Sequence, residues 1–233
     1  MSRERYVVIM AAGSGSRMGA ELPKQFLELE GKSILQRTIE AFLEAVPGVK
    51  VVTVLPEDYV GYWKDLCLEK NFICPQLLVK GGFTRFHSVR NALAKVPDGA
   101  LVAIHDGVRP LVTPQFLREL FEQAENADGV IPVLSCIDTM KVLEKTSLGL
   151  RSVPGASADR SVLYGAQTPQ IFRSELLKEA YGQPFDERFT DDASVMEKYG
   201  KSLSYVTGER LNIKITTQED LVLARAIYSL RED

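Results

Sequence analysis

A glycine-rich segment with two cations follows the apolar run Tyr6–Ile9 and is the first candidate for chemistry. Residues 10–26 read MAAGSGSRMGAELPKQF, and the glycine spacing GxGxxxG matches neither the dinucleotide pattern GxGxxG nor the P-loop pattern. A tight turn between a strand and a helix would explain the glycines alone. Arg17 and Lys24 add positive charge beside backbone N–H groups, and this combination favours a cradle for a polyphosphate.

A carboxylate stands at the end of the apolar run Leu101–His105, in the segment HDGVRP. In open α/β sheets, ligands bind at the carboxyl ends of the strands. Asp106 is therefore either a ligand for Mg²⁺, which takes one or two carboxylates together with substrate phosphates, or a cap of the following turn. His105 has no recognisable nucleophile to pair with, so we interpret it as a packed or hydrogen-bonded core residue.

The segment GGFTRFHSV (residues 81–89) is another predicted turn between a strand and a helix. Thr84 is a predicted helix cap, and Ser88 could simply be an exposed polar residue. The alternative is a turn that contacts the base or ribose of a nucleotide.

The segment NIKITTQED (residues 212–220) also has two interpretations. Thr216 and Glu219 have the spacing of a capping box, which predicts the start of a helix. Lys214 alternates with apolar neighbours on a predicted strand, where it is either an edge residue that blocks pairing or a third cation for phosphates. Upstream, Thr190 is a predicted helix N-cap followed by two acids.

The elements that must position these residues alternate between strands and amphipathic helices. The predicted strands are apolar on both faces, as in a parallel sheet covered by helices, and they span Tyr6–Met10, Val49–Leu55, Leu77–Val79, Leu101–His105 and Gly129–Leu134. The predicted helices begin at Ser or Thr caps and span Ser33–Val46, Thr84–Val96 and Thr113–Ala127. This order predicts an α/β fold with a single doubly wound, mostly parallel, Rossmann-like sheet.

Residues 135–172 interrupt this alternation. Asp138–Leu143 reads as a strand, Glu144–Gly149 as a turn, and Leu150–Val153 as a strand that pairs back. We expect a β-arm at about 136–168 that projects from the sheet and serves dimerisation, with residues 1–233 forming one domain.

The composition excludes several classes of protein. The chain has 233 residues, of which 45% are hydrophobic and 25% charged, and its net charge is −3, so it lacks the basic excess typical of nucleic-acid or membrane-surface binding. Three cysteines without a CxxC pair indicate neither a disulfide framework nor a zinc site. With no signal peptide or long apolar run, we expect a cytoplasmic protein without nucleic-acid or membrane partners.

Taken in order and spacing, these segments resemble one family. The motifs AAGSGSRMG, LPKQF, GG…R..SV, HDGVRP, DTMK, QTPQIF, TDDAS and NIKITTQEDL are similar to those of the 2-C-methyl-D-erythritol 4-phosphate cytidylyltransferases of isoprenoid biosynthesis. The resemblance implies a single α/β nucleotidyltransferase domain with a β-arm, a homodimer, and the use of CTP with Mg²⁺ or another divalent cation. The acceptor would be a polyol phosphate, and pyrophosphate would leave.

The resemblance also implies roles for individual residues. Arg17, Lys24 and Lys214 would be catalytic cations, and Asp106 would bind the metal. CTP would contact Ala11, Ala12, Gly13, Gly15, Gly82 and Ser88. The acceptor would contact Arg109, Thr139, Arg160, Thr168 and Thr190, with Arg160 reaching it from the other subunit.

Two positions depart from the family pattern. Phe83 stands where some members carry an acidic residue, and Gly107 stands where many carry alanine. Three alternatives remain at this point: a ribitol-5-phosphate cytidylyltransferase, a more distant sugar-1-phosphate or molybdopterin nucleotidyltransferase, and a catalytically inactive nucleotide-binding regulatory module. The first alternative is disfavoured by the motif Asp138–Lys141, and the second by the arm. The third is disfavoured by the presence together of Arg17, Lys24, Asp106 and Lys214, since binding alone does not require all four.

Overall fold

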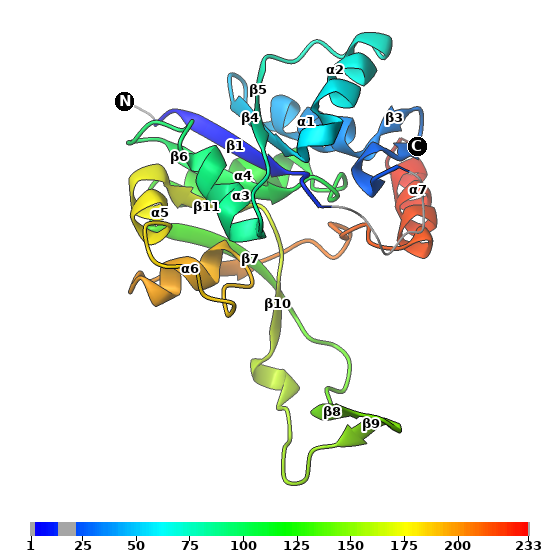
Figure 1. Cartoon of the computed structure of the whole chain (residues 1–233), viewed down its shortest axis with the longest axis vertical. Helices are drawn as coiled ribbons and strands as arrows, with labels where there is room; N and C mark the ends of the chain where they lie inside the picture. The colour runs from blue at the N-terminus through cyan, green and yellow to red at the C-terminus, as the bar shows by residue number, and fades with distance from the viewer. Residues whose placement is uncertain (1–2, 14–21, 233) are drawn as a thin grey trace.

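The structure, a computed structural model, describes residues 3–13 and 22–232, and a mixed, mostly parallel sheet lies at its centre (Figure 1). The strand order across it is β10 (Tyr164–Ala166), β7 (Gly129–Ser135), β11 (Gln170–Arg173), β6 (Leu101–Asp106), β1 (Arg5–Met10), β4 (Lys50–Leu55) and β5 (Gln76–Lys80). Strand β12 (Ser204–Thr207) pairs in parallel with β7, whereas β10 and β11 run antiparallel to their neighbours. The predicted doubly wound α/β fold is confirmed, with β11 inserted between β6 and β7.

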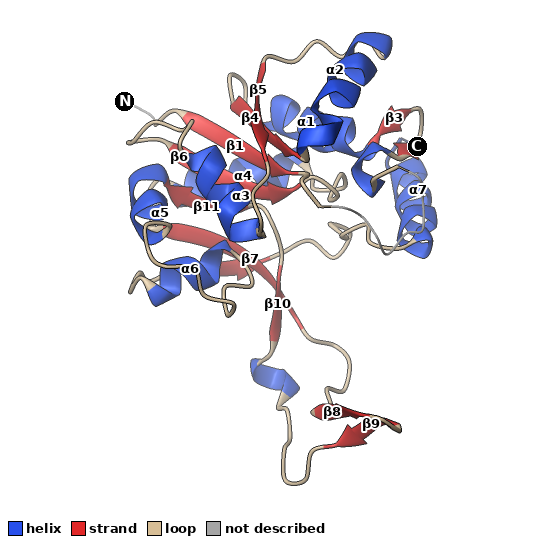
Figure 2. Ribbon diagram, in the orientation of Figure 1, coloured by secondary structure: helices blue, strands red, loops and turns tan. Residues whose placement is uncertain are grey.

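Helices cover both faces of this sheet (Figure 2). They are α1 (Ile34–Ala45), α2 (Val60–Glu69), α3 (Arg85–Leu93), α4 (Pro114–Ala124), α5 (Ser174–Ala180) and α6 (Asp192–Lys198). The last helix, α7 (Gln218–Glu232), packs instead beside the short strand β2, in a third cluster that includes Leu29 and Leu111. Within the described chain, no helix is both long enough and apolar enough to cross a membrane.

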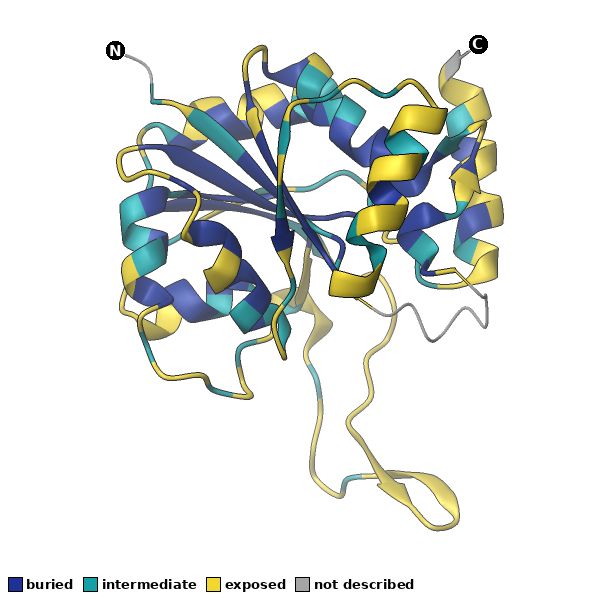
Figure 3. Ribbon diagram, turned by 45° about the horizontal axis from the view of Figure 1, so that its top comes forward, coloured by how far each residue is buried: buried dark blue, intermediate teal, exposed yellow. Residues whose placement is uncertain are grey.

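Alternate residues of the strands enter two separate cores. On β1, Val7 and Ile9 join one cluster with side chains of α1, α2 and α4, whereas Val8 joins another with side chains of α3, α5 and α6. The central strands β1, β4 and β6 are therefore buried on both faces, as Figure 3 shows, because each face is covered by its own helices.

Side-chain caps set the starts of α1, α3 and α4, at the Ser and Thr residues that the sequence predicts. Ser33 Oγ accepts the Gln36 N–H at 3.1 Å, and Thr84 and Thr113 cap α3 and α4 in the same way. A short hairpin of β2 (Glu28–Leu29) and β3 (Lys32–Ser33), which the sequence pattern did not reveal, precedes α1.

The carboxyl ends of β1, β4, β5 and β6 meet at one edge of the sheet because these strands run parallel. Met10 lies beside Asp106 in the register of β1 and β6. The antiparallel β11 brings Thr168, two residues before its start at Gln170, to the same edge. The strands that follow β1 in sequence lie on both sides of it, with β4 and β5 on one side and β6 on the other. Open α/β sheets bind ligands at the carboxyl ends of the strands, at such a reversal of strand order.

A β-arm projects from the sheet, as predicted, and extends well away from the body of the chain (Figure 1). Its hairpin consists of β8 (Leu143–Thr146) and β9 (Gly149–Ser152). The predicted strand at 138–143 is therefore wrong, since pairing starts only at Leu143 and the turn lies at residues 147–148. Residues 164–166 pair with β7 and belong to the sheet, so the arm ends near residue 163.

Two local predictions near the C-terminus are also wrong. Residues 212–215 form no strand but an extended segment, in which the Ile215 N–H donates to the Val108 carbonyl at 2.9 Å. The capping box before α7 is formed by Thr217 and Asp220, each of which accepts the other's backbone N–H. Similarly, Asp191 and not Thr190 caps α6, through a capping box with Ser194.

Candidate active site

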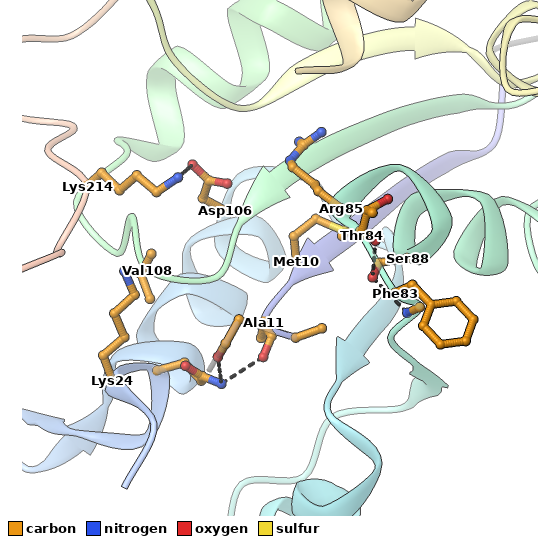
Figure 4. Close-up of a pocket in the computed structure, with 14 residues that line it drawn as sticks. Met10, Ala11, Lys24, Phe83, Thr84, Arg85, Ser88, Asp106, Val108 and Lys214 are labelled. Carbon is orange, nitrogen blue, oxygen red and sulfur yellow. Dashed lines mark hydrogen bonds and ion pairs between the residues drawn. The ribbon is translucent and has the colours of Figure 1, made fainter. Parts of the chain in front are cut away.

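Two adjoining cavities open at the carboxyl edge of the sheet. The larger, about 390 Å³, lies between the segment after β1 and the start of α3 (Figure 4). The smaller, about 260 Å³, lies between β6, β11 and the start of α6. Arg85, Asp106 and Lys214 line both, so the two cavities meet at these three charged side chains.

The segment after β1 forms one wall of the larger cavity with Ala11, Ala12 and Gly13. Gln25 holds this segment: it is almost fully buried, and its Nε2 donates to the carbonyls of Ala11 at 2.7 Å and Gly13 at 3.3 Å. The neighbouring Lys24 also lines the cavity. The predicted contacts Gly15 and Arg17 lie outside the described residues.

The turn before α3 forms the opposite wall. The Gly82 N–H donates to Ser88 Oγ at 2.9 Å, and this hydroxyl donates in turn to the Thr84 carbonyl at 3.0 Å. A Cβ on Gly82 would lie 2.5 Å from the Cβ of His87, so the turn requires glycine at this position. Ser88 is buried and fixes the turn, and Phe83 stands fully exposed at the cavity rim.

Asp106 lies where the two cavities meet, as the register of β6 requires. Its Oδ2 lies 3.0 Å from Lys214 Nζ and 3.2 Å from Arg109 Nε, and its backbone N–H donates to Thr168 Oγ1 at 3.0 Å. Burial by itself would raise the pKa of Asp106, but the positive charges of Lys214, Arg85 and Arg109 hold that pKa well below its usual value. The carboxylate is therefore ionised at any physiological pH.

The residues beside Asp106 are packed tightly. His105 is fully buried, and its Nε2 lies 3.1 Å from the Arg109 carbonyl, so Nε2 must carry the proton that this carbonyl accepts. The burial and this hydrogen bond confirm the interpretation of His105 as a hydrogen-bonded core residue. Burial also lowers the pKa of His105 to about 4. A Cβ on Gly107 would lie 3.1 Å from that of Ala11, so glycine permits this close approach to the β1 loop.

The smaller cavity is lined by three of the predicted acceptor contacts, Arg109, Thr168 and Thr190. The Arg109 guanidinium is anchored by its Nη1, which donates to the Asn212 carbonyl at 2.7 Å. Thr139 and Arg160 line neither cavity of their own chain. Both lie exposed on the arm, where Arg160 Nη1 donates to the Ile137 carbonyl at 3.1 Å.

The donor set at this edge contains little to hold a metal ion without a substrate. Among the described residues, no group of three or more His, Cys, Asp or Glu side chains is placed to hold one. Mg²⁺, however, is commonly bound through one or two carboxylates with phosphate oxygens and water as its other ligands. The ionised Asp106, at the junction of the cavities, fits that mode of binding.

Three residues with a place in the site were not singled out from the sequence. Gln25 stands next to Lys24 in the motif LPKQF, and Arg85 lies within GG…R..SV, so the motifs contained both. Asp192 looked like an ordinary first-turn acid of a helix. In the folded chain it is fully buried and forms an ion pair with Arg85, 107 residues away in sequence.

Comparison with known proteins agrees with this geometry. A family model described as 2-C-methyl-D-erythritol 4-phosphate cytidylyltransferase matches residues 6–230. Proteins of that name from Bacteroides thetaiotaomicron and Phocaeicola vulgatus are 46% and 44% identical, over 95% and 96% of this chain and 98% and 99% of theirs. The crystal structure of the Francisella tularensis enzyme of the same name superposes with a TM-score of 0.78 at 29% identity, covering 96% of this chain and 99% of that one. The match over residues 6–230 and these identities over nearly the full length show that this chain belongs to the 2-C-methyl-D-erythritol 4-phosphate cytidylyltransferase family.

Proposed function

We propose that the larger cavity binds CTP, that the smaller one binds 2-C-methyl-D-erythritol 4-phosphate, and that the cytidylyl group is transferred where they meet. The products are 4-diphosphocytidyl-2-C-methyl-D-erythritol and pyrophosphate, a step of isoprenoid precursor biosynthesis without mevalonate. The observation that carries this proposal is the position of Asp106 and Lys214, which line both cavities and form an ion pair of 3.0 Å. The family assignment supports the choice of substrates.

The reaction joins two anions, so the chain has to align them and compensate their charge. An oxygen of the acceptor phosphate attacks the α-phosphorus of CTP in line, and the bond from that phosphorus to the bridging oxygen of the β-phosphate breaks. The attacking oxygen is already anionic and needs no general base. Lys24 lines the larger cavity and Lys214 lines both, which supports assigning them the neutralisation of charge that builds up on the phosphate oxygens. We assign the same electrostatic role to Arg17.

Asp106 is the residue we assign to the divalent cation. When bound, Mg²⁺ supplies further neutralisation of the phosphate charge. Asp106 already has Lys214 and Arg109 as partners, so the cation would share this carboxylate with them or displace one. Activity should be lost in EDTA and return with added Mg²⁺; activity that persists in EDTA would remove the metal from the proposal.

The arm supports a homodimer in which Arg160 and Thr139 reach the acceptor site of the other subunit. Residues 137–152 of the arm are all exposed, and Leu148, Leu150 and Val162 leave apolar surface uncovered. A two-stranded hairpin without packing is marginal in water, so a second copy is the natural cover. Sedimentation equilibrium should give a dimer for the full chain and a monomer after residues 139–161 are replaced by a short glycine-serine linker.

The experiment that tests the reaction is pyrophosphate release from CTP with each acceptor in turn. Release with 2-C-methyl-D-erythritol 4-phosphate, and little with ribitol 5-phosphate, is the expected result. ATP, GTP and UTP in place of CTP test the base preference. Faster release with ribitol 5-phosphate would assign the chain to that reaction, and CTP binding without release would make it a nucleotide-binding regulatory module. The cytoplasmic location stays a prediction.

A further inference from the structure

Arg85 has a position in the site that no predicted role accounts for. It is the first residue of α3, and its side chain lines both cavities, as Asp106 does. Figure 4 shows it among the residues that line the larger cavity. A cation at this junction lies where the acceptor phosphate and the α-phosphate of the nucleotide must approach each other.

The guanidinium is held from behind by a buried carboxylate. Arg85 Nη2 donates to Asp192 Oδ2 at 2.5 Å, and the hydroxyl of Tyr181 donates to the other oxygen of Asp192 at 2.6 Å. Asp192 and Tyr181 are both buried. The ring of Tyr181 also stacks on Phe86, the residue after Arg85, with centroids 4.7 Å apart. Both the charge partner and the start of α3 are thereby fixed.

This anchoring uses one N–H donor of the guanidinium and leaves the other donors to a ligand. Arginine has five N–H donors, and among the described residues the bond to Asp192 is the hydrogen bond that Arg85 makes. About a third of the side chain remains exposed, at 32%, whereas Asp192 has no exposed surface. A pair that served only to fasten α3 to α6 would not need to open onto two cavities.

The electrostatic surroundings keep this side chain cationic. Burial alone would lower the pKa of Arg85, but the adjacent charge of Asp192 raises it above the ordinary arginine value. A planar, permanently charged fork can bind two phosphate oxygens at once, which a lysine ammonium cannot do with the same geometry.

We propose that Arg85 binds phosphate oxygens of both substrates where the cavities meet, and that Asp192 and Tyr181 are positioning residues that fix its guanidinium for this task. The inference rests on the proposed function and adds a cation to Lys24 and Lys214. Arg85 brings the two reacting phosphates together, so its loss affects the use of both substrates.

The test compares Arg85→Gln and Arg85→Lys with the matched control Arg90→Gln. Arg90 lies on the same helix, is exposed, and lines neither cavity. We expect Arg85→Gln to lower kcat/KM by ~10- to 100-fold for CTP and for the acceptor alike, the range for a hydrogen bond to a charged group. Arg85→Lys should melt within a few degrees of wild type yet recover little activity, and Arg90→Gln should leave all constants within twofold.

A second comparison tests the positioning role. Asp192→Asn and Tyr181→Phe should each lower kcat/KM by less than Arg85→Gln does. The double variant Arg85→Gln/Asp192→Asn should be no worse than Arg85→Gln alone, because Asp192 acts through Arg85. Additive losses would show instead that Asp192 acts independently and would overturn its assigned role.

Two results would overturn the role of Arg85. One is an Arg85→Gln variant that folds and keeps both KM values and kcat within twofold of wild type. The other is full activity in Arg85→Lys, which decides the question if Arg85→Gln does not fold, since a merely structural ion pair is restored by lysine. Absence of turnover in the wild-type chain with CTP and the acceptor would contradict the proposed function itself and is distinguishable from both.

Discussion

The cavity walls and the arm differ in how their side chains are held. Around the cavities, Gln25, Ser88 and Asp106 are buried and each is fixed by at least two hydrogen bonds or ion pairs within the chain. Along the arm, residues 137–152 are exposed throughout, and the hairpin pairs with itself alone in the described structure. The contrast indicates that the chain preorganises the walls of its cavities by itself, whereas the described chain offers the arm hairpin no surface to pack on.

The largest expected effect comes from removing charge at the cavities. Lys24→Ala and Lys214→Ala should each lower kcat by ~10²–10³-fold, by analogy with the loss of one donor to a transition-state oxyanion. KM for CTP should change less, since the charge develops mainly during transfer. Steady-state kinetics with both substrates check this, and near-normal turnover in both variants would remove these lysines from the catalytic set.

A matched pair of leucines sharpens the contrast between body and arm. Leu35 is fully buried under the sheet, and Leu148 is 99% exposed at the tip of the arm. Leu35→Ala should lower the free energy of unfolding by ~2–5 kcal/mol, and Leu148→Ala by no more than ~0.5 kcal/mol. Urea denaturation at low protein concentration measures both. Equal losses would mean that the arm packs on its own chain.

A pH series tests the packing beneath the cavities. The native pKa of His105, about 4, lies below its ordinary value of 6.5 because of burial, so the unfolded chain binds more protons between these two values. Stability therefore falls as the pH drops from 6.5 to 4, by up to about 3 kcal/mol from this residue. Between pH 6.5 and pH 4, the free energy of unfolding of the His105→Gln variant should fall by less than that of the wild type. Parallel curves for the two proteins would contradict the buried neutral histidine.

Mixed dimers test whether the arm serves the other subunit. We expect the activity of the Arg160→Ala variant alone to fall by ~10-fold or more, because the variant loses a charged hydrogen bond to the acceptor. When Arg160→Ala and Lys24→Ala subunits exchange freely, half of the dimers are mixed and each has one intact site. About a quarter of wild-type activity should then return. If mixing restores nothing, Arg160 does not act across the dimer; if Arg160→Ala is fully active alone, it has no role at the site.

Local sequence signals predicted much of the fold correctly, because caps and buried strands depend on neighbouring residues. Ser33, Thr84 and Thr113 began helices as expected, and the apolar runs formed the central strands. Predictions failed where local alternatives were close in energy. The capping box begins at Thr217, one residue later than predicted. Residues 212–215 form no strand, and the Ile215 N–H donates instead to the Val108 carbonyl.

The candidate site divides in the same way. Lys24, Asp106 and Lys214 were identified because their types and motifs point to phosphate chemistry, and the structure brings them to the same cavities. Asp192 stands in the motif TDDAS, but its role could not be found from its type or spacing. As a first-turn acid it is expected at the surface, and its burial depends on Arg85 and Tyr181, which other helices supply.

The sequence by itself therefore determined the family, the parallel α/β alternation and the identity of the cations, since these follow from residue types and short-range spacing. Tertiary structure alone decided that two cavities meet at Asp106, that Arg85 opens onto both, and that the arm turns away from the body of its own chain. The reason is physical. Side-chain pairs such as Arg85 and Asp192 form only when the sheet has brought together helices that are far apart in sequence. A local sequence pattern contains no information on such long-range pairing.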